Sequence, residues 1–118
     1  MSGIPSGGGT EVIKYAKITG LTNSWQTLIT GSANHIITVV SIIFANQSTT
    51  LETATMAQMD DDGTTNVHYF LLDQEIPAYG TFVWNDRFSW DGTKRLRVIT
   101  GTSADMDVYA TYIEQDWS

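Results

Sequence analysis

The residues of this sequence best suited to binding a metal are the consecutive aspartates Asp60, Asp61 and Asp62, which Gly63 follows. Calcium needs several oxygen ligands around a tight turn, and such a run can supply them. The helix-loop-helix calcium loop also needs a bidentate Glu at its twelfth position, and aligning its glycine with Gly63 places Tyr69 there instead. That motif is therefore excluded. Two interpretations stay open, a looser calcium site and a solvated hairpin tip, and the Asp-Gly pair favours the tip.

The two histidines, His35 and His68, are candidates for a metal ligand or a general base. Either role needs carboxylates that converge on the imidazole, and the sequence has neither a His-x-x-x-His spacing nor a cysteine to support one. We expect both to be ordinary packed or surface histidines.

Motifs for nucleophilic catalysis and for phosphate binding are absent from the sequence. There is no Gly-x-Ser-x-Gly, and the Gly7-Gly8-Gly9 run is not followed by the lysine of a phosphate-binding loop. We therefore predict no catalytic residue, no cofactor and no metal, and a function other than catalysis.

Aromatic residues offer the sharpest alternative chemistry. Trp84, Phe88 and Trp90 crowd one short segment, with charged residues between them. Aromatic faces beside carboxylates suit sugar rings, because the C–H groups of a pyranose pack on a π face. The competing interpretation is that these rings close one end of the fold or anchor a contact between subunits, where Trp is enriched. The second interpretation is favoured.

Composition narrows the range of partners. The 118 residues carry a net charge of −7 and only 16% of them are charged. Phosphate contacts need a basic face, so we expect no nucleic-acid partner. Without cysteine there is no disulfide framework and no thiolate zinc site. No run approaches the roughly 18 apolar residues of a membrane helix, and the first residues do not resemble a signal peptide, so we expect neither a membrane partner nor Sec export.

Residues 36–45 form the element around which the rest must be organised. They are rich in Ile, Val, Thr and Phe, whose branched or aromatic side chains suit a pleated strand. Strict alternation would place Ile36, Val40 and Ile42 on one face and Ile37, Val39 and Ile43 on the other. A strand with one solvated face should be polar on that side. Because both faces are apolar here, we expect the second to be covered by another copy or by a partner protein.

The remaining patterns predict an all-β chain, an antiparallel β-sandwich of jelly-roll type with about eight strands. Residues 1–10 are expected to form a flexible Gly- and Ser-rich arm, and residues 11–118 a single domain. Asp91-Gly92 reads as a tight turn between strands, and residues 51–59 could form either a strand or a short helix. The strands are expected over residues 11–19, 25–30, 36–45, 51–59, 66–72, 81–84, 95–100 and 105–115, with a short extended piece over 88–90.

A series of motifs between residues 25 and 115 resembles small virion proteins of tailed bacteriophages. The motifs are Trp25-Gln26-Thr27-Leu28-Ile29, the strand Val39-Val40-Ser41-Ile42-Ile43-Phe44-Ala45-Asn46, the corner Ile76-Pro77-Ala78, Asp91-Gly92 before Leu96-Arg97-Val98, and the closing Tyr109-Ala110-Thr111-Tyr112-Ile113-Glu114. The resemblance implies a β-sandwich decoration, cement or tail-accessory subunit, trimeric or otherwise oligomeric, without catalytic residues.

The resemblance also implies partners and a location. These are further copies of the chain in a homo-oligomer, a phage major capsid protein or other virion proteins, and a place in the virion after assembly in the host cytoplasm. A host glycan is the less favoured ligand. The predicted interface residues are apolar and aromatic: Ile37, Val39, Ile43, Phe82, Trp84, Phe88 and Trp90.

Overall fold

A computed structural model describes residues 10–62, 64–102 and 105–116 of the chain. Within these ranges it contains seven strands and no helix, so the predicted all-β antiparallel fold is confirmed. Of the expected arm, only Thr10 lies among the described residues, and it begins the first strand. The strands are β1 (Thr10–Leu21), β2 (Gln26–Asn46), β3 (Glu52–Met59), β4 (His68–Ile76), β5 (Thr81–Trp84), β6 (Phe88–Thr100) and β7 (Met106–Asp116).

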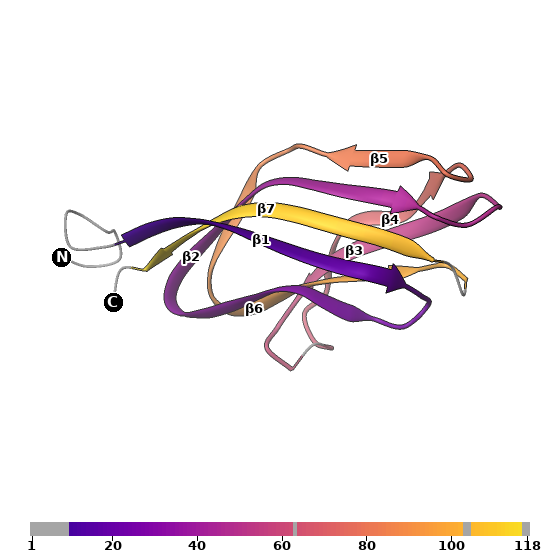
Figure 1. The fold of residues 1–118 in the computed structure, drawn as a ribbon. Helices are drawn as coiled ribbons and strands as arrows, with labels where there is room; N and C mark the ends of the chain where they lie inside the picture. The colour runs from indigo at the N-terminus through magenta and orange to yellow at the C-terminus, as the bar shows by residue number, and fades with distance from the viewer. Residues whose placement is uncertain (1–9, 63, 103–104, 117–118) are drawn as a thin grey trace.

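The strands form one hydrogen-bonded sheet, in the order β1-β7-β2-β6-β3-β4 with β5 beside β2, that folds over on itself (Figure 1). The first layer consists of β1, β7, the second half of β2, β5 and the start of β6. The second layer consists of the first half of β2, the rest of β6, and β3 and β4. β2 and β6 therefore belong to both layers and bend together where they pass from one to the other.

This shared bend explains why seven strands are observed where about eight were expected. Residues 25–30 and 36–45 were predicted as two strands, but they are the two halves of the 21-residue β2. The predicted turn at Asp91-Gly92 is wrong for the same reason, because it lies inside β6, where Gly92 has a φ of +88°. The register of β2 against β6 shifts repeatedly around Ser32, which marks the corner.

The core lies between the layers, and the second half of β2 runs through it. Ile37, Val39, Ile42 and Phe44 are all fully buried there. Strict alternation cannot bury both Val39 and Ile42 on one side. The register against β7 supplies the reason, because it jumps between Val39 and Ser41 and leaves Val40 as an extra, bulged residue. The expected division of residues 36–45 into two uniform faces is therefore corrected at Val40.

Asn46 joins two of the sequence motifs that were noted separately. Its side chain is buried at the end of β2, and Nδ2 donates hydrogen bonds to the carbonyl oxygens of Thr50 (2.9 Å), Ile76 (3.1 Å) and Pro77 (3.1 Å). Oδ1 accepts from the backbone N–H of Ser48 at 2.9 Å and from its hydroxyl at 2.7 Å. The asparagine that closes the central strand thus holds the Ile-Pro-Ala corner in place.

Candidate functional site

The structure separates the predicted interface residues into three groups, of which the first lies inside the chain. Ile37 and Val39 have no exposed surface, and the opposite-face alternative Ile42 has none either. These side chains hold the two layers together and offer nothing for a partner to contact. Ile36 and Val40 are partly exposed.

The second group is the aromatic segment, which packs against a ring that the sequence did not single out. Phe70, on β4 of the second layer, stacks on Phe88 with ring centroids 4.1 Å apart and forms a T-shaped contact with Trp84 at 6.1 Å. Phe88 stacks in turn on Trp90 at 6.1 Å. On the same inner side of the first layer, Phe82 lies 6.3 Å from the core ring of Phe44.

These contacts fill the space between β5 and the start of β6 in the first layer and β4 in the second. Trp90 is only 8% exposed, and Trp84 donates its indole N–H to the carbonyl of Asp86 at 2.8 Å. A sugar ring needs a free aromatic face. Because Phe88 stacks on both Phe70 and Trp90, and Trp84 is in edge-type contact with Phe70 and Phe88, the contacts fit the packing interpretation better than the sugar-binding one.

Two carboxylates of the acidic turn, those of Asp60 and Asp62, accept hydrogen bonds within the turn itself. Asp62 accepts hydrogen bonds from the backbone N–H groups of Thr64 (2.8 Å) and Thr65 (2.9 Å), and these bonds lower the pKa of its carboxyl from 3.8 to about 2. Asp60 accepts from the side-chain amide of Asn66 at 2.7 Å. The described part of the chain holds no group of three or more His, Asp or Glu side chains arranged for a metal ion. The geometry is that of a hairpin tip.

The histidines occupy separate places. His68 forms a T-shaped contact with Phe70, with ring centroids 5.0 Å apart. His35 forms a hydrogen bond from Nδ1 to the Glu114 carboxylate, which also receives the Lys14 ammonium at 2.9 Å, and His35 Nε2 lies 3.7 Å from Asp116. This ion cluster ties β1, β7 and β2 together at one end of the first layer. No sequence spacing indicated it, because its members come from three strands.

The Lys14–Glu114 pair should make stability depend on pH. Burial raises the pKa of Glu114, but hydrogen bonds from Lys14 and His35 outweigh it, so the net pKa lies below the usual 4.5. The hydrogen bond to Glu114 likewise raises the pKa of Lys14 above 10.5. An acid whose pKa is lower in the folded state stabilises the fold at pH values above its unfolded-state pKa, and this stabilisation is lost as the pH falls through the folded-state pKa. For a lysine whose pKa is raised by folding, the stabilisation is lost as the pH rises through the folded-state pKa.

We therefore expect Glu114→Gln to lower the free energy of unfolding by about 1 kcal/mol at neutral pH, since Lys14 is half-exposed and solvent weakens the pair. The difference from the parent should shrink as pH falls below 4.5, where the parent glutamate also loses its charge. Urea denaturation across this range measures both effects. Glu75→Gln, which removes a carboxylate from an exposed position of β4, is the control and should cost less at neutral pH. Equal deficits at acid and neutral pH would contradict the expectation.

The third group contains Ile43, which points out of the first layer and is 38% exposed. It lies between two other exposed apolar residues, opposite Tyr109 of β7 on one side and Val83 of β5 on the other. On β1, Tyr15 places its ring 5.9 Å from that of Tyr109, and Ile13 is two residues further along the same face. We call these five residues, Ile13, Tyr15, Ile43, Val83 and Tyr109, the outer patch.

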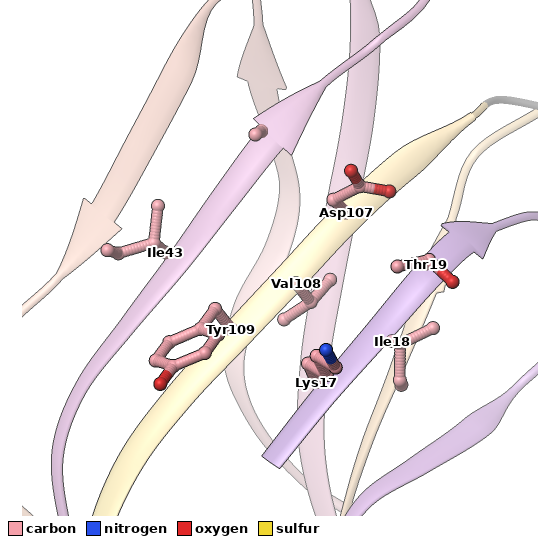
Figure 2. Close-up of a pocket in the computed structure, with 8 residues that line it drawn as sticks. Lys17, Ile18, Thr19, Ile43, Asp107, Val108 and Tyr109 are labelled. Carbon is pink, nitrogen blue, oxygen red and sulfur yellow. The ribbon is translucent and has the colours of Figure 1, made fainter. Parts of the chain in front are cut away.

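The outer patch borders a shallow hollow on the same face. Figure 2 shows Lys17, Asp107, Tyr109 and Ile43 around it, on three adjacent strands. The hollow has a volume of about 190 Å³. The small side chain of Ala45 lies along its β2 side, so it can accept a protruding side chain.

Charges lie at the ends of this face and leave its middle neutral. Alternation along the described strands of the first layer places four charged residues on the outer side: Glu11 and Asp91 toward one end, Lys17 and Asp107 toward the other. Between them the polar residues carry hydroxyl groups, as at Thr38 and Thr111. The structure thus gives the central strand an apolar outer neighbourhood, which is the feature that suggested a covered second face.

No helix in the described residues is long and apolar enough to cross a membrane. No protein-family model matches the sequence, and no curated protein matches it.

Several solved structures share the fold. A chain from the structure reported as "Bacillus endospore appendages form a novel family of disulfide-linked pili" matches with a TM-score of 0.54 at 14% identity, over 100% of this chain and 98% of that one. A capsid chain of Helicobacter pylori bacteriophage KHP30 matches with a TM-score of 0.54 at 11% identity, over 93% and 94%. A chain of infectious bursal disease virus, Gx strain, matches at 0.54 and 13% identity, and this chain covers only 32% of it. At these identities the likeness is one of fold, and the fold is one that capsid and pilus subunits use.

Proposed function

We propose that this protein is a non-enzymatic structural subunit of a bacteriophage virion, and within that role a decoration or cement subunit that stabilises the capsid. The observation that carries the proposal is the outer patch, an exposed apolar band on the face of the first layer that points away from the core. Such a band on a soluble domain marks a surface that another protein covers.

The physical character of the patch suits assembly. It lies on a hydrogen-bonded sheet, so docking requires little ordering of backbone, and ordering is one of the main costs of association. Its aromatic members, Tyr15 and Tyr109, belong to a residue type enriched at interface centres. The neutral middle of the face lets two chains that each carry −7 approach without strong repulsion.

The shared fold supports a building-block role in general terms, because two of the full-length neighbours come from repeating assemblies, a phage capsid and a pilus. The pilus in question is described as disulfide-linked, and this sequence contains no cysteine, so an assembly of this chain would not use disulfides. The resemblance noted in the sequence is to phage virion proteins, which favours a virion over a pilus and fits a capsid and a tail position equally. A tail or neck subunit would use the same kind of contacts at a different position in the virion.

Ile43→Lys tests the proposal directly. The lysine would bring an ammonium group into the centre of the covered patch, and we expect it to weaken self-association or attachment to the shell by at least about tenfold. Light scattering after size-exclusion chromatography measures the oligomer, and co-sedimentation with phage particles measures attachment. Val67→Lys is the matched control, because Val67 is a β-branched residue with 37% exposure outside the first layer.

A reduced assembly with an unchanged unfolding midpoint for Ile43→Lys, and normal assembly for Val67→Lys, is the expected pattern. If the parent protein is a monomer at high concentration and binds neither shell nor tail, the proposal fails. Titration of tryptophan fluorescence with sugars then decides whether the carbohydrate-binding alternative at Trp84 and Trp90 should replace it. Attachment to purified tails but not to capsids would move the subunit to the tail.

A further inference from the structure

β1 is a long edge strand with no proline and, up to Ile18, no bulge to prevent pairing, and the protection it does carry consists of the charged residues Glu11, Lys14 and Lys17. Among the described strands it pairs only with β7, so its other edge is free (Figure 1). The register is regular over nine residues, from Thr10 to Ile18, without a bulge, and the segment contains no proline. Long, regular, unbulged edges are ready templates for another strand.

The opposite edge of the sheet shows what protection looks like. β4 also has a free edge, but its register against β3 shifts at Met56 on both sides, and Asp73 adopts a left-handed φ of +53°. Such irregularities twist an edge strand away from new partners. β5, which pairs only with β2, is just four residues long, so β1 presents the longest regular run of backbone donors and acceptors among the edge strands described.

We propose that β1 pairs antiparallel with β1 of a second copy about a two-fold axis at Lys14, so that two first layers form one continuous sheet. This inference rests on the proposed role as an assembly subunit and names one partner in that assembly. A two-fold axis perpendicular to the sheet keeps the outer sides of both copies on the same side of the joined sheet. Directly opposed residues must then both lie on the outer side or both on the inner side, so an odd-numbered residue faces an odd-numbered one and an even-numbered residue an even-numbered one.

The side chains select one register among those that remain. With the axis at Lys14, Glu11 of each copy lies opposite Lys17 of the other, and Ile13 lies opposite Tyr15. Opposite charges and apolar pairs at opposed positions are the combinations that stabilise antiparallel strands. Lys14 is the midpoint of the regular segment from Thr10 to Ile18, so an axis there lets the whole segment pair with its copy.

Neighbouring registers lose these pairs. An axis at Tyr15 would place Glu11 opposite Thr19 and Lys17 opposite Ile13, and an axis at Ile13 would place Glu11 opposite Tyr15. The chosen register does bring two Lys14 side chains together. Each is already paired with its own Glu114 at 2.9 Å, which offsets the repulsion.

The contact would also extend the outer patch. Ile13 and Tyr15, which are 62% and 63% exposed at the edge of one copy, become the middle of a patch shared by two. A doubled apolar band is a better platform for a shell protein than either half. A trimer, as the sequence resemblance implies, would need a second contact elsewhere on the chain.

The absence of cysteine allows the register to be read by engineered disulfides. Directly opposed residues of antiparallel strands have Cβ atoms about 4.5–5.5 Å apart, close enough for a disulfide after small adjustments. Lys14→Cys should therefore form a covalent dimer with itself on mild oxidation, at least about ten times faster than Val12→Cys alone. An equimolar mixture of Val12→Cys and Ala16→Cys chains, which keeps Lys14, should cross-link as well, while Ala16→Cys alone should not.

Charge exchange gives a second readout without cysteine. Lys17→Glu places two like-charged pairs in each dimer and should weaken dimerisation about fivefold, and Glu11→Lys together with Lys17→Glu should restore it. Analytical ultracentrifugation measures both constants.

The outcomes separate this inference from the proposed function. If neither Lys14→Cys nor the mixed pair cross-links faster than the single controls, or if another register cross-links instead, the two-fold contact is overturned. Should the parent still oligomerise and attach to phage particles in that case, with sensitivity to Ile43→Lys, the proposed function survives. A monomer that binds no particle overturns both.

Discussion

Replacement of Gly31 by alanine is expected to destabilise the fold by about 3 kcal/mol or more, a large part of the stability of a small domain. Gly31 lies at the corner where β2 passes between the layers, and a Cβ atom there would be 2.2 Å from the Gly92 carbonyl oxygen and 2.8 Å from that of Lys94. It would also lie 2.8 Å from Nε1 of the buried Trp90. Backbone carbonyls of the paired strand cannot rotate away as a side chain can, so the whole corner must open.

Gly92→Ala is the matched control, because it changes the same residue type at the same corner. A Cβ at Gly92 meets nothing within 4 Å, but the φ of +88° is unfavourable for alanine, so only a conformational cost of about 1–2 kcal/mol is expected. Chemical denaturation of both variants measures the difference. If Gly31→Ala costs no more than Gly92→Ala, close packing at the corner is not what holds the two layers in register.

The corner also shows how far the sequence could predict the fold. The composition and alternation of residues 36–45 identified a strand correctly, and the all-β class followed from the turn-rich pattern around it. Gly31, Asn34 and Asp91-Gly92 carry the residue types of tight turns, and a turn was the natural prediction. In the structure these residues bend two strands that stay paired with each other, and local sequence does not distinguish a bend inside a strand pair from a turn that ends it.

The sequence predicted that the candidate site would be an apolar strand face, but it identified only some of the residues on that face. The expectation that residues 36–45 have an apolar outer side led to Ile43, but Ile37 and Val39 were placed with it because alternation was assumed to continue. One bulged residue, Val40, reverses the faces, and bulges have no reliable sequence signature. Tyr109 and Val83 complete the patch only through the register of β7 and β5 against β2, which depends on long-range pairing.

Asn46→Asp is the second variant with a large expected effect, about 3 kcal/mol of lost stability at neutral pH. The buried amide nitrogen donates to three carbonyl oxygens, those of Thr50, Ile76 and Pro77, and a carboxylate in its place would direct negative charge at all three. Asn46→Ala should be similarly costly, because it leaves those acceptors and the Ser48 N–H without their partner. Both substitutions therefore test the side chain that connects β2 to the Ile-Pro-Ala corner.

The pH dependence of Asn46→Asp distinguishes lost donors from lost volume. A protonated aspartic acid can donate one hydrogen bond to these carbonyls, so the folded state should raise its pKa above the ordinary value of about 3.9. The folded state then binds more protons than the unfolded state, and stability falls as pH rises between the two pKa values. The loss of stability relative to the parent should therefore be smaller near pH 3 than near pH 7. A pKa shift of about one unit would make the difference about 1.4 kcal/mol, and a larger shift would increase it. Asn85→Asp, the same exchange at an exposed loop position, should show almost no deficit at either pH. A pH-independent deficit for Asn46→Asp would mean that packing of the side chain, and not its donated hydrogen bonds, holds the corner against the central strand.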